Sequence, residues 1–181
     1  MISSTPYVSQ TKSWSDPTFT LAPFNLIFLP GGHEKSVRQV IESARVHSLL
    51  ADYFPSTKKP SNRAIAAVCH GVLVLSESLD ENGQSLIRDL DTTTLPSEFE
   101  GVAYWGTRAF LGDYYKTFGG GSESCQQMVV SKLGRKDQFK HSLAAGNFVV
   151  EDEKHNYLSG RFPGDAKLLA NKCVEMVKSN A

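Results

Sequence analysis

Cys69 and His70 are the residues of this sequence best placed to do chemistry, because they stand together where an apolar run ends. The run from Ala64 to Val68 is continuous and apolar, as in a buried strand, and a helix-compatible segment begins at Val72. A sharp turn between a strand and a helix, a nucleophile elbow, lifts a side chain clear of the sheet. A thiol there lies at a helix N-terminus, which favours the reactive thiolate, and a neighbouring imidazole can act as its base or counter-ion.

The number and placement of the cysteines limit the hypothesis of a reactive Cys69. A free cysteine is most often a small buried residue, so Cys69 has a purely structural interpretation as well. The other two cysteines, Cys125 and Cys173, lie in helix-like surroundings, and we interpret both as structural. An odd and sparse set without metal-type spacing argues against disulfides and against a metal site, and favours a reducing compartment, for which the cytoplasm is the default.

The elements that must position Cys69 follow from the apolar spacing. We expect a polar tail over residues 1–22 and a single domain over residues 23–181. The apolar run from Phe24 to Leu29 predicts a strand that ends at a glycine-bearing turn. Further expected elements are a helix over Ser36–Phe54, a short strand over Thr92–Leu95, a helical segment opening at Pro96–Gly101, a strand over Phe148–Glu151 with a hairpin partner over Lys154–Leu158, and a helix over Pro163–Ser179.

Strands that alternate with helices predict parallel pairing with right-handed crossovers. Near-continuous apolar strands fit a sheet that is covered on both faces, and ligands of such α/β proteins gather at the carboxyl ends of the strands. Two loops stand at such ends, Gly31-Gly32-His33 and Cys69-His70-Gly71. We therefore expect both loops to meet at one crevice.

Composition excludes several classes of partner. The chain has 181 residues, 40% hydrophobic and 21% charged, as expected for one globular domain. Its formal net charge is +0 and it has no basic run, so neither nucleic acid nor an anionic membrane surface is an expected partner. No apolar stretch is long enough to span a bilayer, and the polar N-terminus lacks the apolar core of a secretory signal.

Four segments carry a resemblance to a known family. They are FNLIFLPGGHEK (24–35), AIAAVCHGVLVLSE (64–77), TTTLPSEFE (92–100) and FVVEDEKHNYLSGRFPGDAKLLA (148–170). In this order they resemble the DJ-1/PfpI (ThiJ) family of the class I glutamine amidotransferase-like superfamily. The PGGH and VCHG motifs are most similar to the larger chaperone and glyoxalase-III-like members.

The resemblance implies a flavodoxin-like three-layer α/β/α sandwich with a mainly parallel sheet and a cysteine-based site. By position, Cys69 would be the nucleophile, His70 the general base, and Glu98 the acid that orients the histidine, with Glu100 as second choice. Backbone N–H groups of Gly32 and His70 would face a developing oxyanion. Gly31, Gly71 and His33 would complete the pocket, with His33 binding a carbonyl oxygen.

Each of these assignments has a structural alternative. His33 is also placed to cap the helix expected from Ser36. Glu98 and Glu100 are also suited to the first turn of a helix, where carboxylates favour the dipole. The aromatic residues between Ala103 and Gly121 would form a pocket lid, a dimer patch or part of the core. His141 and His155 have no evident partner and are expected at the surface.

The sequence departs from the family at its beginning. Family members have a strand, a helix and a strand before the segment that matches Phe24–Leu29, and a glutamate there contacts the thiol. This sequence has a polar stretch instead, and no glutamate precedes Glu34. We therefore expect the N-terminal strand region of the family to be missing, which leaves the activation of the thiol open and would expose an edge of the sheet.

The resemblance implies a cysteine-dependent enzyme without a cofactor that acts on a small carbonyl compound, as glyoxalase III converts methylglyoxal to a hydroxy acid. One alternative is an amidase or peptidase of the PfpI type. Another is a non-enzymatic redox sensor or holdase chaperone. The expected partners are a small carbonyl or amide substrate and a second copy in a homodimer. True amidotransferase activity is not expected, because Val68 stands where that chemistry uses glycine.

Overall fold

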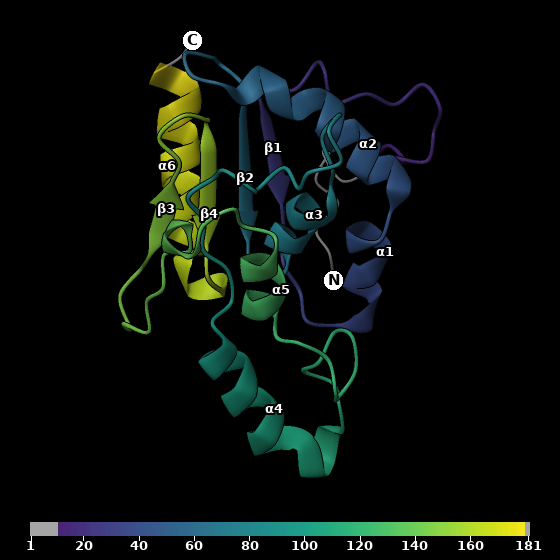
Figure 1. The fold of residues 1–181 in the computed structure, drawn as a ribbon, viewed down its shortest axis with the longest axis vertical. Helices are drawn as coiled ribbons and strands as arrows, with labels where there is room; N and C mark the ends of the chain where they lie inside the picture. The colour runs from purple at the N-terminus through teal and green to yellow at the C-terminus, as the bar shows by residue number, and fades with distance from the viewer. Residues whose placement is uncertain (1–10, 180–181) are drawn as a thin grey trace.

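The computed structural model describes residues 11–179, so residues 1–10 of the expected tail lie outside the described part. Its centre is one four-stranded sheet formed by β1 (Leu26–Leu29), β2 (Ala64–Val68), β3 (Val149–Glu151) and β4 (Tyr157–Gly160), in the order β1-β2-β4-β3. β2 pairs in parallel with β1 and β4, whereas β3 runs antiparallel to β4. The mainly parallel α/β sheet is confirmed, and the expected hairpin forms with its second strand at Tyr157–Gly160 instead of Lys154–Leu158 (Figure 1).

Helices cover both faces of the sheet, and the alternation of side chains along β2 explains why (Figure 1). Ile65 and Ala67 pack into a core with α1 (Arg38–Ile41), α2 (Ala44–Tyr53), α3 (Gly71–Glu77) and α5 (Cys125–Ser131). Ala64, Ala66 and Val68 pack into a second core with α6 (Ala166–Ser179). The structure is thus the α/β/α sandwich expected from the resemblance.

The region predicted as one helix over Ser36–Phe54 is broken into shorter pieces. A 3₁₀ turn, η1 (Lys35–Val37), leads into α1, and α2 then begins anew, with Ser43 accepting a hydrogen bond from the N–H of Val46. A further turn, η2 (Phe54–Thr57), follows. Serine is a strong N-cap, so it starts a new helix at a position where the apolar spacing alone predicts continuity.

The predicted strand over Thr92–Leu95 does not form. The segment makes a single parallel bridge between Thr92 and Phe139, and its hydroxyl groups bond to other parts of the core. Two more 3₁₀ turns, η3 (Lys136–Gln138) and η4 (Pro163–Asp165), complete the described elements, and η4 opens into α6 where the sequence predicts a helix from Pro163.

Helix α4 (Ser97–Leu111) lies away from the sheet and forms the tapering end of the molecule (Figure 1). It begins after Pro96 and has Glu98 and Glu100 in its first turn. Gly112, with a φ of 58°, ends it. The expected helical opening at Pro96 is therefore confirmed, and the helix continues through much of the aromatic stretch that the pattern left unassigned.

Strand β1 lies at one edge of the sheet. Its inward side chains are buried, but Phe28, on the face that α6 covers elsewhere, is 41% exposed. No helix of the described residues is long and apolar enough to cross a membrane.

Candidate active site

The turn after β2 holds Cys69 in an unusual backbone conformation. Its φ is 56°, and among residues 11–179 it is the one residue other than glycine with a positive φ. The N–H of Cys69 still continues the sheet by donating to the carbonyl oxygen of Gly160 at 3.0 Å. Since α3 begins two residues later, the chain reverses direction at the cysteine itself. This is the strand, turn and helix geometry of a nucleophile elbow, and strain of this kind is concentrated at functional sites.

Two glycines let the neighbouring loop press against this turn. A Cβ atom at Gly31 would lie 2.6 Å from the Cβ of Cys69 and 2.6 Å from the carbonyl oxygen of Val68. A Cβ atom at Gly71 would collide with the carbonyl of Leu29. The two loops at the carboxyl ends of β1 and β2 therefore meet as the sequence predicts, and both positions require glycine on steric grounds.

The sulfur of Cys69 is surrounded by hydrogen-bonding groups. Its Sγ lies 3.4 Å from Nδ1 of His70. Burial raises the pKa of the thiol to about 11, while hydrogen bonds from the backbone N–H groups of His70 and Gly32 act in the opposite direction. The side chain is almost fully buried. The thiol is therefore protonated at neutral pH, and the helix N-terminus does not produce the thiolate that the sequence pattern suggests.

His70 is neutral as well. Burial lowers the pKa of its imidazole to about 4, against the opposing effect of the Glu100 carboxylate, and His33 and Lys116 lower it further. A neutral imidazole can accept a proton, whereas an imidazolium cannot. The pair is thus poised as an acid and a base that have not yet exchanged their proton.

The structure separates the two acids proposed for orienting His70. Glu98 points outward, where its Oε2 lies 3.3 Å from Nε2 of His141 and its side chain is 49% exposed. Glu100 is buried and lines a narrow crevice together with His70 and Cys125. The choice of Glu98 is therefore a correction: because 3.6 residues make a turn, residues 97, 100 and 104 share the inner face of α4 and residue 98 does not.

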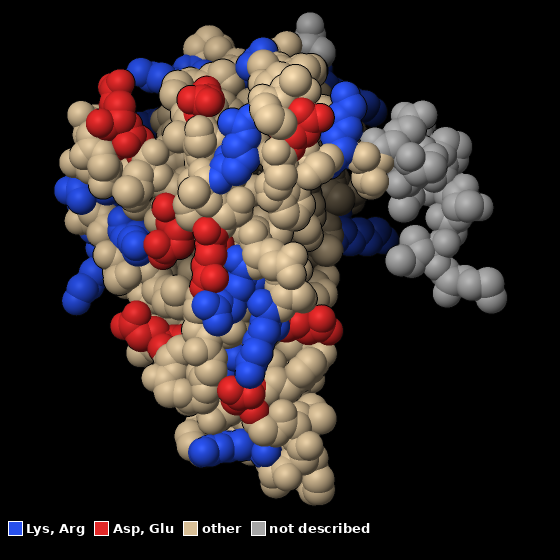
Figure 2. All heavy atoms as spheres, turned by 90° about the vertical axis from the view of Figure 1, so that its right-hand side faces the viewer, with Lys and Arg blue, Asp and Glu red and all other residues tan. Residues whose placement is uncertain are grey.

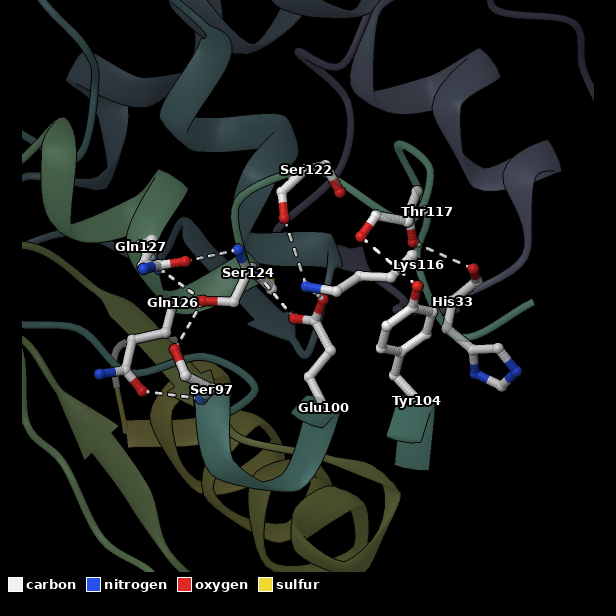
Figure 3. A network of polar contacts seen from close by, with 12 residues as sticks. His33, Ser97, Glu100, Tyr104, Lys116, Thr117, Ser122, Ser124, Gln126 and Gln127 are labelled. Atoms are coloured by element: carbon white, nitrogen blue, oxygen red, sulfur yellow. Dashed lines mark hydrogen bonds and ion pairs between the residues drawn. The ribbon is translucent and has the colours of Figure 1, made fainter. Parts of the chain in front are cut away.

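Glu100 is the centre of a polar network beneath the elbow (Figure 3). Its Oε1 lies 2.9 Å from Nζ of Lys116, and its Oε2 accepts a hydrogen bond of 2.8 Å from the N–H of Cys125. Nζ of Lys116 also donates to the carbonyl oxygen of Ser122 and lies over the ring of Tyr104. The carboxylate is thereby held in place below His70, although no hydrogen bond joins the two side chains.

His33 lies beside the site rather than at a helix end. Its ring stacks on Tyr115 at a centroid distance of 4.6 Å and meets Tyr114 edge-on at 4.9 Å. Its carbonyl oxygen accepts a hydrogen bond from the hydroxyl of Thr117 (Figure 3). Nε2 is buried and has no hydrogen-bond partner among the described residues. The 3₁₀ turn that follows has no side-chain cap, so the alternative role of His33 as a cap is not observed.

A family model described as ThiJ/PfpI family-like matches residues 1–142. The chain belongs to this family. The match begins at the first residue and so includes the polar stretch that precedes β1.

The individual relatives described below are at most 28% identical to this ThiJ/PfpI-family chain. The uncharacterized protein C14C4.04 of Schizosaccharomyces pombe is 28% identical over 98% of this chain and 59% of its own length. Two solved structures share the fold. The Rapid Encystment Protein 24 KDa of Francisella tularensis has a TM-score of 0.67 and 21% identity over 92% of this chain and 63% of its own. Glyoxalase III of Candida albicans has a TM-score of 0.56 and 18% identity over 84% and 57%. The chain thus spans about three fifths of the length of these relatives.

Two residues near the elbow of the ThiJ/PfpI-family chain, Thr94 and Lys116, were not found from the sequence. The hydroxyl of Thr94 donates to the carbonyl oxygen of Cys69 at 2.7 Å and lies 3.1 Å from the sulfur of Cys125. Lys116 comes from the aromatic stretch that showed no clear period. Only the spacing of Glu100 and Tyr104, four residues apart on one helix, offered a signal, because it predicts a shared inner face.

A second buried ion pair closes the site from the other side. Arg161, which is fully buried, contacts both carboxylate oxygens of Asp165 at 2.9 Å. Its remaining N–H groups donate to the carbonyl oxygens of Ser142, Ala144 and Gly146. Burial raises the pKa of the Asp165 carboxyl, but hydrogen bonds from Arg161 and from the N–H of Phe148 outweigh it and hold the pKa below its usual value. This pair fixes the loop that presents Gly160 to Cys69.

A hollow of about 1060 Å³, lined mainly by residues 51–58 and 79–90, does not reach Cys69. Within the described residues, no group of three or more His, Cys, Asp or Glu side chains is arranged to hold a metal ion. We place the candidate site at the elbow, on its chemistry, rather than at this hollow.

Proposed function

We propose that this protein is a cysteine-dependent enzyme that acts on a small carbonyl compound without a cofactor, in the manner of glyoxalase III. The observation that carries the proposal is the neutral thiol of Cys69 lying 3.4 Å from the neutral imidazole of His70, beneath the N–H groups of His70 and Gly32. This arrangement supplies a nucleophile, a base and a stabiliser for an oxyanion at one point.

In the first step, the sulfur adds to the aldehyde carbon of a 2-oxoaldehyde such as methylglyoxal. The S–H bond breaks as the S–C bond forms, and the proton passes to Nδ1 of His70. The carbonyl oxygen becomes an oxyanion, which the two backbone N–H groups stabilise and which then takes up the proton to give a hemithioacetal. Because thiol and imidazole start neutral, the charge pair exists only during the reaction, when the buried Glu100 carboxylate favours the imidazolium.

In the following steps, His70 moves the proton of the former aldehyde carbon to the neighbouring carbon. The hemithioacetal thereby becomes a thioester of the 2-hydroxy acid, with no change in the overall oxidation state. Water then cleaves the S–C bond, releases the hydroxy acid and restores the thiol. His33, whose Nε2 has no partner among the described residues, is suited to bind the second carbonyl oxygen of the substrate.

The proposal draws support from the fold that the chain shares with glyoxalase III of Candida albicans. Amide hydrolysis of the PfpI type is the second candidate, because the same elbow and N–H groups would stabilise an acyl-transfer intermediate.

The deciding experiment measures lactate formed from methylglyoxal by the wild type and by the variants Cys69→Ala and Cys173→Ala. Both cysteines are buried, but Cys173 lies on α6 and away from the elbow, so it is the matched control. We expect Cys69→Ala to lose all turnover and Cys173→Ala to retain it. Turnover that survives in Cys69→Ala, or a wild type that forms no lactate, would contradict the proposal. Release of ammonia from small amides in place of lactate would favour the second candidate.

A further inference from the structure

The outward face of α4 is apolar and uncovered. Val102 is 75% exposed, Trp105 69% and Phe110 89%. Gly106 and Ala109, which are also exposed, lie between them on the same face of the helix, because residues three and four positions apart are neighbours. Leu111 at the end of the helix is 49% exposed. Figure 2 shows the tapering end from one side, with basic and acidic side chains among an otherwise uncharged surface.

The opposite face of α4 explains why the helix is nevertheless well defined. Glu100 and Tyr104 are buried there and contact Lys116, and Ser97 bonds to the side chains of Ser124 and Gln126 on α5 (Figure 3). The helix is thus anchored by polar contacts on its inner side, while its largest apolar side chains point away from the core. Trp105 contacts the ring of Tyr104 edge-on at 5.0 Å and the guanidinium of Arg108, but most of its surface stays exposed.

The size of this surface indicates a binding interface. Four large apolar side chains exposed to this degree amount to roughly 500 Å² per molecule, above the few hundred Å² usual for a monomer. Two such surfaces joined would bury on the order of 1,000 Å², which reaches the lower limit for a specific protein interface. A membrane is a poorer fit, because membrane-bound helices carry several Lys or Arg residues on the polar face, whereas α4 has Arg108 alone and two glutamates.

We propose that the outward face of α4 binds the same face of a second copy of the chain, with the two helices antiparallel. In this arrangement the two-fold axis that relates the copies passes near Gly106, so that Val102 of one copy lies opposite Phe110 of the other. Gly106 permits close approach, since nothing lies within 4 Å of a Cβ atom built there. Because the formal net charge is +0, two copies of the chain do not repel one another through their net charge.

The interface residues lie on the same helix as Glu100 and Tyr104, on the opposite face. The proposed contact therefore leaves the Glu100 carboxylate and its partners within one copy unchanged.

The first test is a cysteine cross-link. Gly106→Cys places a thiol at the centre of the proposed contact, and Gly101→Cys places one on the same helix about 140° away, also with no atom within 4 Å of the new Cβ. The three native cysteines are buried and serve both variants as the same background. Under mild oxidation we expect Gly106→Cys to form a disulfide-linked dimer at least ten times faster than Gly101→Cys. Equal rates would overturn the proposed geometry.

The second test measures association without a cross-link. In analytical ultracentrifugation of the full chain, we expect a reversible dimer whose dissociation constant rises at least 100-fold in Phe110→Glu. Leu79→Glu, at an equally apolar position that is 49% exposed and remote from α4, should leave it unchanged. A wild type that stays monomeric over a 100-fold range of protein concentration, up to its solubility limit, would overturn the proposal. A dimer whose dissociation constant does not change in Phe110→Glu would overturn it as well. So would flotation of the wild type, but not of Phe110→Glu, with anionic phospholipid vesicles.

Discussion

Two buried ion pairs lie on either side of the elbow, and they differ in how completely they are satisfied. Arg161 and Asp165 form a two-pronged contact, and every remaining N–H of the guanidinium that the structure describes has a backbone carbonyl within reach. Glu100 and Lys116 meet through one contact, and the carboxylate is shared with a backbone N–H. The first pair is rigid and saturated, while the second retains the freedom to respond to a change of charge.

The difference indicates that the two ion pairs have separate roles. A planar guanidinium with all donors used fixes the loop around it, as expected of a structural element. A lysine paired singly with a carboxylate beneath an imidazole instead sets the electrostatic field in which the imidazole gains a proton. We expect substitutions in the first pair to act on stability and substitutions in the second to act mainly on chemistry.

The largest effect is expected from Asp165→Asn. It leaves the Arg161 charge buried without its counter-ion, and breaking such a pair typically costs about 3–5 kcal/mol in the free energy of unfolding. Urea denaturation measures this loss. Asp113→Asn provides the control, because it removes the partner of Lys35 at the surface, where a pair is worth about 0–1 kcal/mol. A loss for Asp165→Asn no greater than that of the control would refute the structural role.

The next effect is the dependence of stability on pH. Because the pKa of His70 is lowered from 6.5 to about 4, the unfolded chain takes up a proton before the native protein does. The stability linked to His70 is complete above pH 6.5 and is lost as the pH falls toward 4, by about 3 kcal/mol at most. The pKa of Asp165 is also lowered, so its contribution is lost only at still lower pH, below its usual value of 3.8.

Denaturation series between pH 7 and pH 4 separate these contributions. We expect His70→Asn to flatten the decline in stability over that range, whereas His141→Gln, at a half-exposed position, should leave the decline as it is. A wild type whose stability is constant from pH 7 to pH 4.5 would show that His70 is not buried as described.

A smaller effect on stability, with a larger one on chemistry, is expected from Glu100→Gln. The amide keeps the shape of the side chain and still accepts from the N–H of Cys125, and Lys116 retains contact with Ser122, so we expect a loss of about 1–2 kcal/mol. The pKa of His70 should fall further, because the carboxylate that raises it is gone. Turnover should drop roughly 10–100-fold through a weaker base, with the imidazole titration followed by NMR. An unchanged pKa would remove Glu100 from the mechanism.

The smallest effect is expected from Glu98→Gln. This acid stands two residues from Glu100 but contacts the solvent-exposed His141, so its loss should change stability by less than about 0.5 kcal/mol and turnover by less than twofold. The same assays apply. A larger drop in turnover for Glu98→Gln than for Glu100→Gln would reverse the assignment and restore the choice that the sequence alone suggested.

The parts of the molecule predicted well are those in which local pattern and long-range packing agree. The run Ala64–Val68 is buried on both faces, so its apolar character sufficed to predict a central strand, and Gly31 and Gly71 follow from the same two loops. The segment Thr92–Thr94 has the composition of a strand, but the hydroxyl groups of Thr92 and Thr94 bond to Tyr157, Ser159 and Cys69 instead. Such contacts join residues far apart in sequence and leave no local pattern.

The charge states were the least predictable feature. A cysteine at a helix N-terminus next to a histidine suggests a thiolate, but the pKa depends on burial, and burial depends on how α4 and the segment of residues 112–124 cover the elbow. Lys116 enters this environment from a stretch without periodicity. Its role is set by the three-dimensional arrangement alone, and only its pairing with Glu100 reveals it.

The order of strands has a consequence for synthesis of the chain. β2 is the central strand, and it pairs on one side with β1, which is made before it, and on the other with β4, which is made almost last. During translation, one edge of Ala64–Val68 therefore stays unpaired until residues 157–160 and α6 have emerged from the ribosome. Such long-range parallel pairing folds slowly and exposes apolar surface meanwhile. The nascent elbow, whose cysteine N–H awaits Gly160, is the part of this protein that most needs protection by chaperones at the ribosome.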